Sequence, residues 1–265
     1  MTRILSWNVN GIRALEKKGL VEWMQQERPD ILCLQETKAQ PEQLSEALRA
    51  PAGYHAYFAS AERKGYSGLV VYSRIKPRSV EQMGISAFDR EGRLLALEFP
   101  EFYFLGAYFP NSQDGGRRLD YKLEFCDAVL RLLDDLVRSG FDLVLSGDYN
   151  IAHRPIDLSR PEENEDSAGY LPEERAWMEK LTTSGYVDTF RAFTPDPDNY
   201  TWWSYRGGAR RRNVGWRIDY HCVNHRLMDW VSSSTIRPEV GGSDHCPVEL
   251  VITVPAAEPN RTELS

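Results

Sequence analysis

Cysteine is scarce in this sequence and does not occur in closely spaced pairs. Cys33, Cys126, Cys222 and Cys246 are far apart and sit in apolar stretches. Disulfide frameworks and structural zinc sites need several cysteines, or cysteines and histidines, at characteristic spacings. The sequence therefore argues against a disulfide-stapled fold and a zinc site, and it predicts buried, reduced thiols.

No long hydrophobic run is present either. The most apolar stretch, residues 102–109, is far shorter than the roughly 20 residues that cross a bilayer, and Gly106 interrupts it. The first residues lack the cationic segment and apolar segment of a secretion signal. We therefore expect no membrane association and a cytoplasmic location.

The chain has no excess of positive charge. Its 32 Lys and Arg residues against 39 Asp and Glu residues give a formal net charge of −7. A chain of this charge is not a polybasic nucleic-acid binder, so a nucleic acid could bind only at a local basic patch. One segment offers such a patch beside aromatic residues: Trp202, Trp203, Arg206, Arg210, Arg211, Arg212, Trp216 and Arg217.

Flexible linkers and repeats are also missing, while 42% of the 265 residues are hydrophobic. This composition excludes a disordered chain and is enough for one large core. We expect a monomer with a single domain over residues 1–255 and a flexible polar tail over residues 256–265.

Strand patterns outnumber helical patterns. Helices are predicted over residues 20–28, 41–50, 119–139 and 172–185, with proline or glycine marking their ends. Helices among more numerous strands predict an α/β (α+β) fold in which helices cover the outside of sheets. Long loops are predicted over residues 155–171 and 206–215. Strands are predicted over residues 4–9, 30–35, 54–59, 68–73, 94–99, 102–109, 142–146, 200–205, 216–223 and 247–254.

Polar residues end several of these apolar strands. Asp148 and Asn150 are two residues apart and so share one face, as do Asn8 and Asn10 in the first strand pattern. A single strand-end carboxylate usually caps a turn. A whole set is different, because carboxylates leave water only when they are paired, bind a metal or serve a function. The set predicts a site for Mg²⁺ or Mn²⁺ beside a general base, and it comprises Asn8, Glu36, Asp148, Asn150, Asp219, Asp244 and His245.

Seven segments that include these residues closely resemble the exonuclease III family of apurinic/apyrimidinic endonucleases, within the wider endonuclease/exonuclease/phosphatase superfamily. The resemblance implies a four-layer α/β sandwich, in which two packed mixed β-sheets are flanked by helices and the site lies at one edge. The segments occur in order from residue 7 to residue 247 and read WNVNGIR, LQETK, GYSG, YFPN, GDYNIAH, NVGWRIDY and GSDHCP.

The resemblance also implies a catalytic role for each residue. Glu36 resembles the main Mg²⁺ ligand, with Asn8 and Asp244 at the same metal. Some members carry Asp where this chain has Asn10, which speaks against a metal site with two carboxylates there. Glu36, an amide and waters are enough for Mg²⁺, because this ion keeps several waters. Asp148 resembles the residue that orients or deprotonates the attacking water, and Asn150 resembles the one that holds the phosphate or that carboxylate. His245 and Tyr108 resemble residues that contact the phosphate. Asp219 resembles the partner that orients His245.

Substrate contacts are implied in the same way. Asn111 resembles a phosphate-contacting residue, and Trp202, Trp216 and Ile218 resemble the lining of a pocket for a flipped abasic sugar. We expect the basic patch to bind the DNA backbone, with Arg206, Arg210, Arg211, Arg212 and Arg217 as its members.

The implied activity is a Mg²⁺-dependent DNA repair nuclease, for which Mn²⁺ is a possible substitute ion. It would cut double-stranded DNA on the 5′ side of an abasic site, leave a 3′-hydroxyl, and also trim or clean 3′ ends. Two alternatives stay open: a Mg²⁺-dependent phosphatase or phosphodiesterase of the superfamily that acts on another substrate, and a DNA-binding module with a decayed site.

Other polar residues are expected to be structural. His55 and His225 are predicted at the surface, and His221 is predicted to pack within a strand. His153 lies in a matched segment without a chemical role that we can derive, and the acids over residues 162–166 are predicted to form a solvated loop face.

Overall fold

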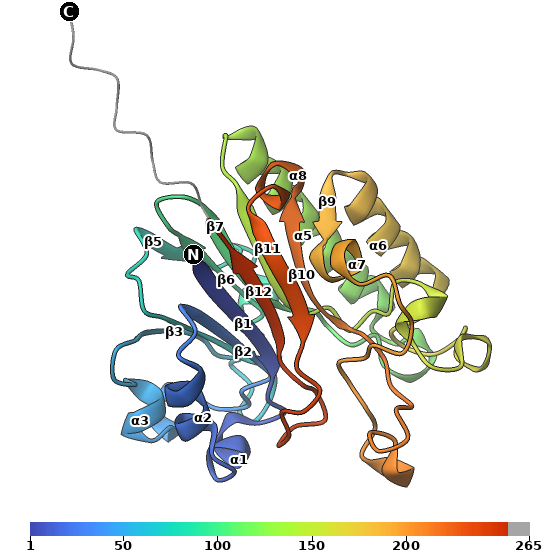
Figure 1. Ribbon diagram of the computed structural model, residues 1–265, viewed down its shortest axis with the longest axis horizontal. Helices are drawn as coiled ribbons and strands as arrows, with labels where there is room; N and C mark the ends of the chain where they lie inside the picture. The colour runs from blue at the N-terminus through green and yellow to red at the C-terminus, as the bar shows by residue number, and fades with distance from the viewer. Residues whose placement is uncertain (254–265) are drawn as a thin grey trace, which may run out of the picture.

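Two mixed sheets of six strands each form the centre of the computed structural model, which describes residues 1–253 (Figure 1). The predicted tail over residues 256–265 lies outside the described residues. The first sheet has the order β11-β12-β1-β2-β4-β3, with β1 (Thr2–Asn8), β2 (Ile31–Gln35), β3 (His55–Ala59), β4 (Leu69–Ser73), β11 (Val231–Ile236) and β12 (Val248–Ile252). The second has the order β5-β6-β7-β8-β10-β9, with β5 (Ser79–Glu81), β6 (Leu94–Glu98), β7 (Tyr103–Tyr108), β8 (Leu143–Asp148), β9 (Tyr186–Asp188) and β10 (Asp219–Asn224).

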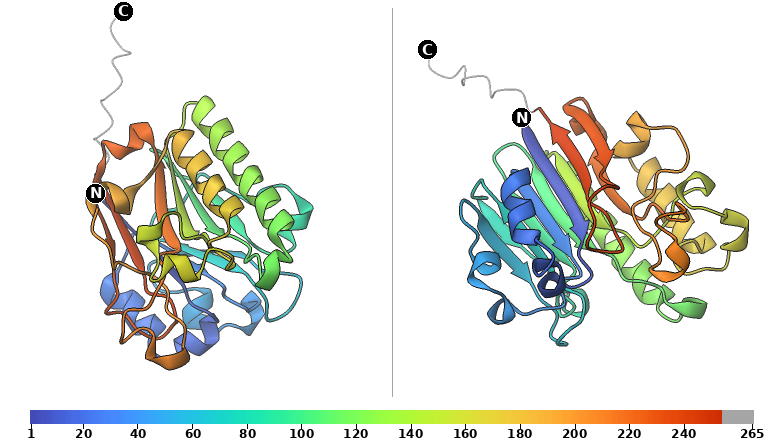
Figure 2. Two further views of the ribbon diagram at one scale, coloured as in Figure 1. Left: turned by 90° about the vertical axis from the view of Figure 1, so that its right-hand side faces the viewer. Right: turned by 60° about the horizontal axis from the view of Figure 1, so that its bottom comes forward.

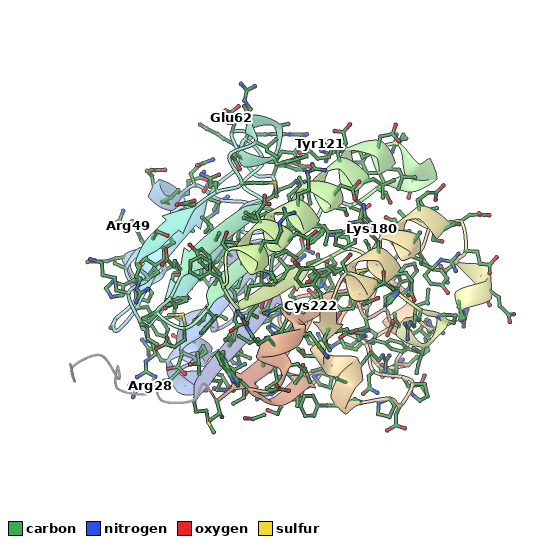
Figure 3. The ribbon with its side chains drawn as sticks, turned by 90° about the horizontal axis from the view of Figure 1, so that it is seen from above. Arg28, Arg49, Glu62, Tyr121, Lys180 and Cys222 are labelled. Carbon is green, nitrogen blue, oxygen red and sulfur yellow. The ribbon has the colours of Figure 1, made fainter. Side chains whose placement is uncertain are left out.

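Helices cover the outer faces of both sheets (Figure 2). On the first sheet these are α1 (Ile12–Glu16), α2 (Leu20–Glu27) and α3 (Glu46–Arg49), and on the second α5 (Leu119–Arg138) and α6 (Pro172–Thr183), which run side by side in Figure 3. The predicted four-layer sandwich is confirmed. The shorter helices are α4 (Ser86–Asp89), α7 (Thr189–Phe193) and α8 (His225–Met228).

The alternation of side chains along each strand builds the separate apolar layers. On β1, Ile4 packs between the two sheets, while its neighbour Leu5 packs under the helices of the first sheet. On β8, Val144 and Leu145 divide in the same way between the inter-sheet layer and the layer under α5 and α6. Because both faces of these strands are covered, the central strands are almost continuously apolar.

The helix predictions hold best where end signals are strong. Helix α5 ends with Gly140 beyond its C-cap, at a φ of 92° that suits glycine. The single helix predicted over residues 41–50 is wrong: a 3₁₀ turn over Pro41–Gln43 is followed by α3, which Ser45 caps through its side chain. Ser45 favours a cap over a helix interior because its hydroxyl competes for backbone partners.

Two strand predictions also differ from the structure. Residues 200–205 form no strand and make only isolated bridges, among them Trp202 with Trp216 and Trp202 with His245. The strand predicted over residues 216–223 begins only at Asp219. The polar β11 and the three-residue strands β5 and β9 were not predicted, because their sequences carry little apolar alternation.

Strand direction determines where the site forms. Strands β1 and β2 are parallel neighbours in the first sheet, and β7 and β8 are parallel neighbours in the second. The carboxyl ends of all four strands therefore meet at one edge of the sandwich, where polar side chains can converge. Among the described residues, no helix is both long and apolar enough to cross a bilayer.

Candidate active site

A cleft of about 900 Å³ opens at this edge of the sandwich. Its floor is built from strand ends, and its walls come from the loops after β8 and before β10. The floor residues are Asn8 at the end of β1, Glu36 after β2, Tyr108 at the end of β7, Asp148 at the end of β8 and His245 before β12. Asp219 at the start of β10 contacts His245 but does not line the cleft itself.

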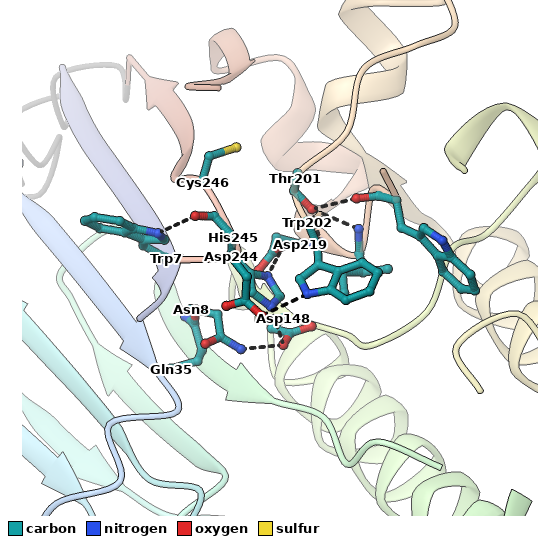
Figure 4. Close-up of polar contacts among 12 residues, drawn as sticks. Trp7, Asn8, Gln35, Asp148, Thr201, Trp202, Asp219, Asp244, His245 and Cys246 are labelled. Atoms are coloured by element: carbon teal, nitrogen blue, oxygen red, sulfur yellow. Dashed lines mark hydrogen bonds and ion pairs between the residues drawn. The ribbon is translucent and has the colours of Figure 1, made fainter. Parts of the chain in front are cut away.

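His245 is the centre of a buried charged cluster (Figure 4). Its Nδ1 lies 2.8 Å from Oδ2 of Asp219, and its Nε2 lies 3.9 Å from Oδ2 of Asp148. All three residues are buried, with exposed fractions of 4% or less. The hydrogen bond to Asp219 orients the ring so that Nε2 faces Asp148 and the cleft.

Burial and close charges shift both titrating partners strongly. Burial and the neighbouring carboxylate of Asp219 raise the pKa of Asp148 to about 7. Burial disfavours the charged form of His245, but the carboxylates of Asp219, Asp148 and Asp244 outweigh that effect and raise its pKa to about 10. Near neutral pH the imidazole is therefore a cation with a proton on both nitrogens, beside a carboxyl group that gains and loses a proton.

Two amides hold Asp148 in place. Asn8 donates from Nδ2 to Asp148 Oδ2 at 2.8 Å and to Glu36 Oε2 at 3.0 Å. Asn150 donates from its backbone N to Asp148 Oδ1 at 2.8 Å and from Nδ2 to Oδ2 at 3.2 Å. Asn150 also donates to the Phe109 carbonyl, so both of its amide hydrogens are used within the protein. Of the two implied tasks for Asn150, this geometry favours holding the carboxylate.

Asn8 does not fit the implied task of a metal ligand. Its amide oxygen accepts from the backbone N of Asn10 at 2.9 Å, and its amino group faces Glu36 and Asp148. An amino group does not coordinate a cation, so this arrangement makes Asn8 a bridge between the two carboxylates.

The remaining donors fit a hard divalent cation. Asp148 and Asp219 offer carboxylate oxygens within 4.8 Å of each other, and Glu36 and Asp244 add carboxylates at the same floor. Oδ1 of Asp219 is buried and has no hydrogen-bond partner. Carboxylate oxygens with room for water are the surroundings that Mg²⁺ and Mn²⁺ prefer. Glu36, Asp148 and Asp244 are the residues that would hold such an ion.

Two tryptophans form an apolar wall beside this floor. Trp202 and Trp216 meet edge to face, with ring centroids 6.3 Å apart, and Ile218 packs in the same small cluster. Trp202 also donates from Nε1 to Asp244 Oδ2 at 3.1 Å, which ties the wall to the floor. Trp203 points the opposite way and is buried in the core, as alternation predicts.

The arginines of the predicted basic patch have different surroundings. Arg206 and Arg212 line the cleft, whereas Arg211 is exposed outside it. Arg210 donates to the carbonyls of Ser243, Pro238 and Val240 and stacks over Trp203, so its guanidinium ties two loops together.

The prediction for Arg217 is wrong. Its side chain is fully buried, where it bonds Asp157 at 2.8 Å and Asp188 at 2.6 Å and stacks over Tyr220. Arg217 follows Trp216 in an extended segment, so the two side chains point to opposite sides. With Trp216 in the cleft, Arg217 points into the protein, where two carboxylates compensate its charge.

Tyr108 at the end of β7 and Asn111 in the loop that follows it also line the cleft. Asn111 donates to Asn150 Oδ1 at 3.0 Å and lines the cleft. Arg93 lies 5.1 Å from the Tyr108 ring centroid and donates to the Tyr108 carbonyl. Burial and the charges of Glu36 and Asp148 raise the pKa of Tyr108 well above its ordinary value, so its hydroxyl remains a donor.

The histidines outside the site behave largely as expected. His55 and His225 are exposed, and His221 is buried on β10 with its Nδ1 2.6 Å from Ser146 Oγ. His153 is also buried, and its Nε2 lies 2.6 Å from Glu179 Oε2. The acids over residues 162–166 are exposed, but Glu163 and Asp166 line the cleft, which was not predicted.

A buried ion pair that supports the floor was also missed. Lys122 and Glu174 are both fully buried, and Lys122 Nζ donates to Glu174 and to the Asn150 carbonyl, each at 2.6 Å. Glu174 in turn accepts from the backbone N of Gly169 in the cleft wall. The available signal was Lys122 itself, a charged residue on the apolar face of α5.

Comparison with known proteins identifies the family. The sequence profile of the Endonuclease/Exonuclease/phosphatase family matches residues 5–245. The chain belongs to this family. The exodeoxyribonuclease of Bacillus subtilis is 42% identical over 255 residues, which cover 95% of this chain and 100% of that protein. The DNA-(apurinic or apyrimidinic site) endonuclease of Dictyostelium discoideum is 41% identical over 254 residues, which cover 94% of this chain and 70% of that protein.

Solved structures agree with the Endonuclease/Exonuclease/phosphatase assignment. An AP endonuclease from Archaeoglobus fulgidus superposes with a TM-score of 0.85 at 28% identity, covering 96% of this chain and 100% of that one. The family and the fold expected from the sequence are thus confirmed, and the prediction of a hydrolytic nuclease agrees with these relatives. Nucleases of this family depend on a metal, which agrees with the acidic cluster of the cleft floor.

Proposed function

We propose that this protein is a Mg²⁺-dependent DNA repair nuclease that hydrolyses the phosphodiester on the 5′ side of an abasic site and leaves a 3′-hydroxyl. The same site would trim and clean 3′ ends. The observation that carries the proposal is the buried His245–Asp219 pair facing Asp148 on the floor of a tryptophan-walled cleft. The relatives named as an exodeoxyribonuclease and an apurinic-site endonuclease support it.

The floor residues divide the work of hydrolysis. Asp148, once deprotonated, accepts a proton from the attacking water or orients it, because its carboxylate is held by Asn8 and Asn150. His245 is held as a cation by Asp219, and its Nε2 donates to a non-bridging phosphate oxygen as negative charge develops. Tyr108 lines the cleft with a hydroxyl that remains protonated, and it donates to the same phosphate.

Mg²⁺ at Glu36 would neutralise charge on the phosphate and on the departing 3′ oxygen as a Lewis acid, with Mn²⁺ as a possible substitute. Glu36 presents its carboxylate at the cleft floor, and Asp244 presents a second one that Asn10, Ser243 and Trp202 orient. Both side chains are fixed by hydrogen bonds, which keeps the oxygen donors at the floor with little rearrangement.

Selection of damage would be steric. Trp202, Trp216 and Ile218 form an apolar wall next to the hydrolytic floor, which suits a sugar without its base. Turning an abasic nucleotide out of the duplex costs less than unstacking a paired one. The wall therefore favours abasic sites both by fit and by the lower cost of flipping.

Arg206 and Arg212 line the cleft and would bind the DNA backbone. They supply local positive charge in a chain whose overall net charge is −7.

The two alternative functions fit the cleft less well. A phosphatase for inositol phosphates would have no use for these arginines beside the tryptophan wall. A decayed site would not keep the hydrogen-bonded cluster intact. A monomeric state and a cytoplasmic location stay predictions from the sequence.

The test is incision of a duplex oligonucleotide with one abasic analogue. With Mg²⁺ we expect a single nick on the 5′ side and a 3′-hydroxyl that a polymerase extends, and with a chelator no nick. The matched intact duplex should remain uncut internally, with slow loss of nucleotides from its 3′ ends. Release of phosphate from inositol phosphates without any nicking would overturn the proposal.

A further inference from the structure

Lys38 lies inside the group of oxygen donors that the proposed metal site would use. Its Nζ is 2.8 Å from Glu36 Oε1 and 2.6 Å from the amide oxygen of Asn10. Asn10 in turn donates from Nδ2 to Asp244 Oδ1 at 3.0 Å. The ammonium group therefore bridges two oxygen donors at the place where a hard cation would find them.

The backbone brings Lys38 to this place. Asn10, Glu36 and Lys38 all have left-handed φ values, 45°, 57° and 53°, which turn their side chains toward one another. Backbone hydrogen bonds fasten the segment on both sides, from Lys38 N to the Ser67 carbonyl and from Gly11 N to the Glu36 carbonyl, each at 2.8 Å. Such conformations persist only where the surroundings hold them, so the contact is built into the fold.

We infer that Lys38 competes with the divalent cation for Glu36 and so sets the metal affinity of the site. The inference rests on the proposed function, because it assumes that the metal binds at Glu36. Two cations a few ångströms apart repel each other strongly in a partly buried site. Metal binding and the Lys38–Glu36 ion pair therefore oppose each other. The apparent affinity for the metal is the intrinsic affinity multiplied by the fraction of molecules in which Glu36 is not paired with Lys38.

The Lys38 ammonium also compensates the negative charge of the floor carboxylates when no metal is bound. Glu36 shares Asn8 with Asp148, and Asp244 is tied to the Lys38 partner Asn10. The Lys38 ammonium, whose side chain is 34% exposed, offsets this negative charge and can swing out to solvent. Coupling between two ligands of a protein typically changes affinity by about 5- to 150-fold, and by the same factor in both directions.

The first test measures Mn²⁺ binding to the DNA-free protein by electron paramagnetic resonance of the free ion. We expect Lys38→Met to lower the dissociation constant for Mn²⁺ by about 5-fold or more. Lys38→Arg keeps the positive charge and should stay near the wild-type value. Lys17→Met is the matched control, because Lys17 is exposed and lines the same outer groove as Lys38. Thermal unfolding of each variant checks that it is folded.

The reciprocal test follows Lys38 itself. Brief acetylation with acetic anhydride, read by mass spectrometry, should label Lys38 more in Mg²⁺ than in chelator, while the labelling of Lys17 stays the same. The inference is wrong if Lys38→Met binds Mn²⁺ no more tightly than the wild type, or if the acetylation of Lys38 is the same in Mg²⁺ and in chelator. The proposed function stands in either case. If the wild-type chain binds no Mn²⁺ at all, the inference and the proposed metal site fail together.

Discussion

Asp148 and Asp219 stand directly opposite each other on the antiparallel strands β8 and β10. Two carboxylates placed in this way repel, and His245 lies between them with one ring nitrogen toward each. Burial, together with this strand register, thus accounts for the raised pKa of Asp148, and the two carboxylates account for the protonated state of His245. Functional acid–base groups are often created by this kind of enforced proximity.

Incision should depend on pH with two limbs. Asp148 acts only when deprotonated, and its raised pKa means that kcat/KM rises as the pH increases through about 7. His245 donates only when protonated, so kcat/KM falls again as the pH increases through about 10. A cation bound beside Asp148 moves the first limb to lower pH. Initial rates across this range check the profile, and a flat profile would contradict these assignments.

Replacing Asp219 should lower the pKa of His245. In Asp219→Asn the imidazole loses its charged partner, so its proton should be released at much lower pH than in the wild type. Titration followed by NMR of the ring nitrogens measures this directly. His153 serves as the internal control, because its partner is Glu179 and its titration should not move. An unchanged His245 titration would show that the pair does not set the charge.

The tryptophan wall should affect abasic substrates selectively. Trp216→Ala removes one face of the apolar cluster with Trp202 and Ile218. Losing the apolar burial of the sugar against a large side chain typically costs about 1.5–3 kcal/mol, so kcat/KM on abasic duplex should fall about 10- to 150-fold. Trp216→Phe should recover part of the loss. Equal losses on abasic duplex and on 3′ ends of intact duplex would argue against a pocket for the abasic sugar.

Arg211 and Arg212 form a natural pair for testing the DNA surface. Both are exposed, but only Arg212 lines the cleft. Arg212→Ala should weaken duplex binding and reduce the slope of log affinity against log salt by about 1, whereas Arg211→Ala should change the slope less. Fluorescence anisotropy at several salt concentrations measures both. If the two variants have the same slope, Arg212 has no special role in binding the DNA backbone.

Arg217 should matter for stability through its two buried partners. Arg217→Met leaves Asp188 buried without its guanidinium, while Asp157 loses one of two and keeps Arg191. Breaking a buried pair in this way typically lowers the free energy of unfolding by about 3–5 kcal/mol. Urea unfolding gives this value, with Arg211→Ala as the exposed control. A change below about 1 kcal/mol, the range of exposed pairs, would indicate that the network contributes little.

The strand-end residues of the site could be predicted because each breaks an apolar pattern in a visible way. Glu36 and Asp148 are acids placed where apolar runs stop, and Asp219 is an acid within an apolar context. Their convergence depends on strand order and direction, which local patterns do not encode. Only the resemblance, through the order of seven matched segments, indicated that these strand ends share one edge.

Charged residues with distant partners could not be assigned in the same way. Arg217 lies next to a basic segment, and its partners Asp157 and Asp188 are 60 and 29 positions away. Lys122 and Glu174 are 52 positions apart and meet only after α5 and α6 pack together. Lys38 belongs to a matched segment, but its contact with Glu36 and Asn10 requires a left-handed backbone conformation at all three residues. None of the three is a glycine, so the sequence gives no signal for this conformation.

The most direct test of the whole account is single-turnover incision of abasic duplex by Asp148→Asn, with binding of the same duplex measured alongside. The amide has nearly the same shape as the carboxylate, and its one oxygen can still accept from the backbone N of Asn150, so the fold and the dissociation constant for DNA should change little. The rate of bond cleavage should fall by about 10²- to 10⁴-fold, the usual loss when a general base is removed. Near wild-type cleavage by the folded variant would contradict the assignment of this cluster as the hydrolytic centre.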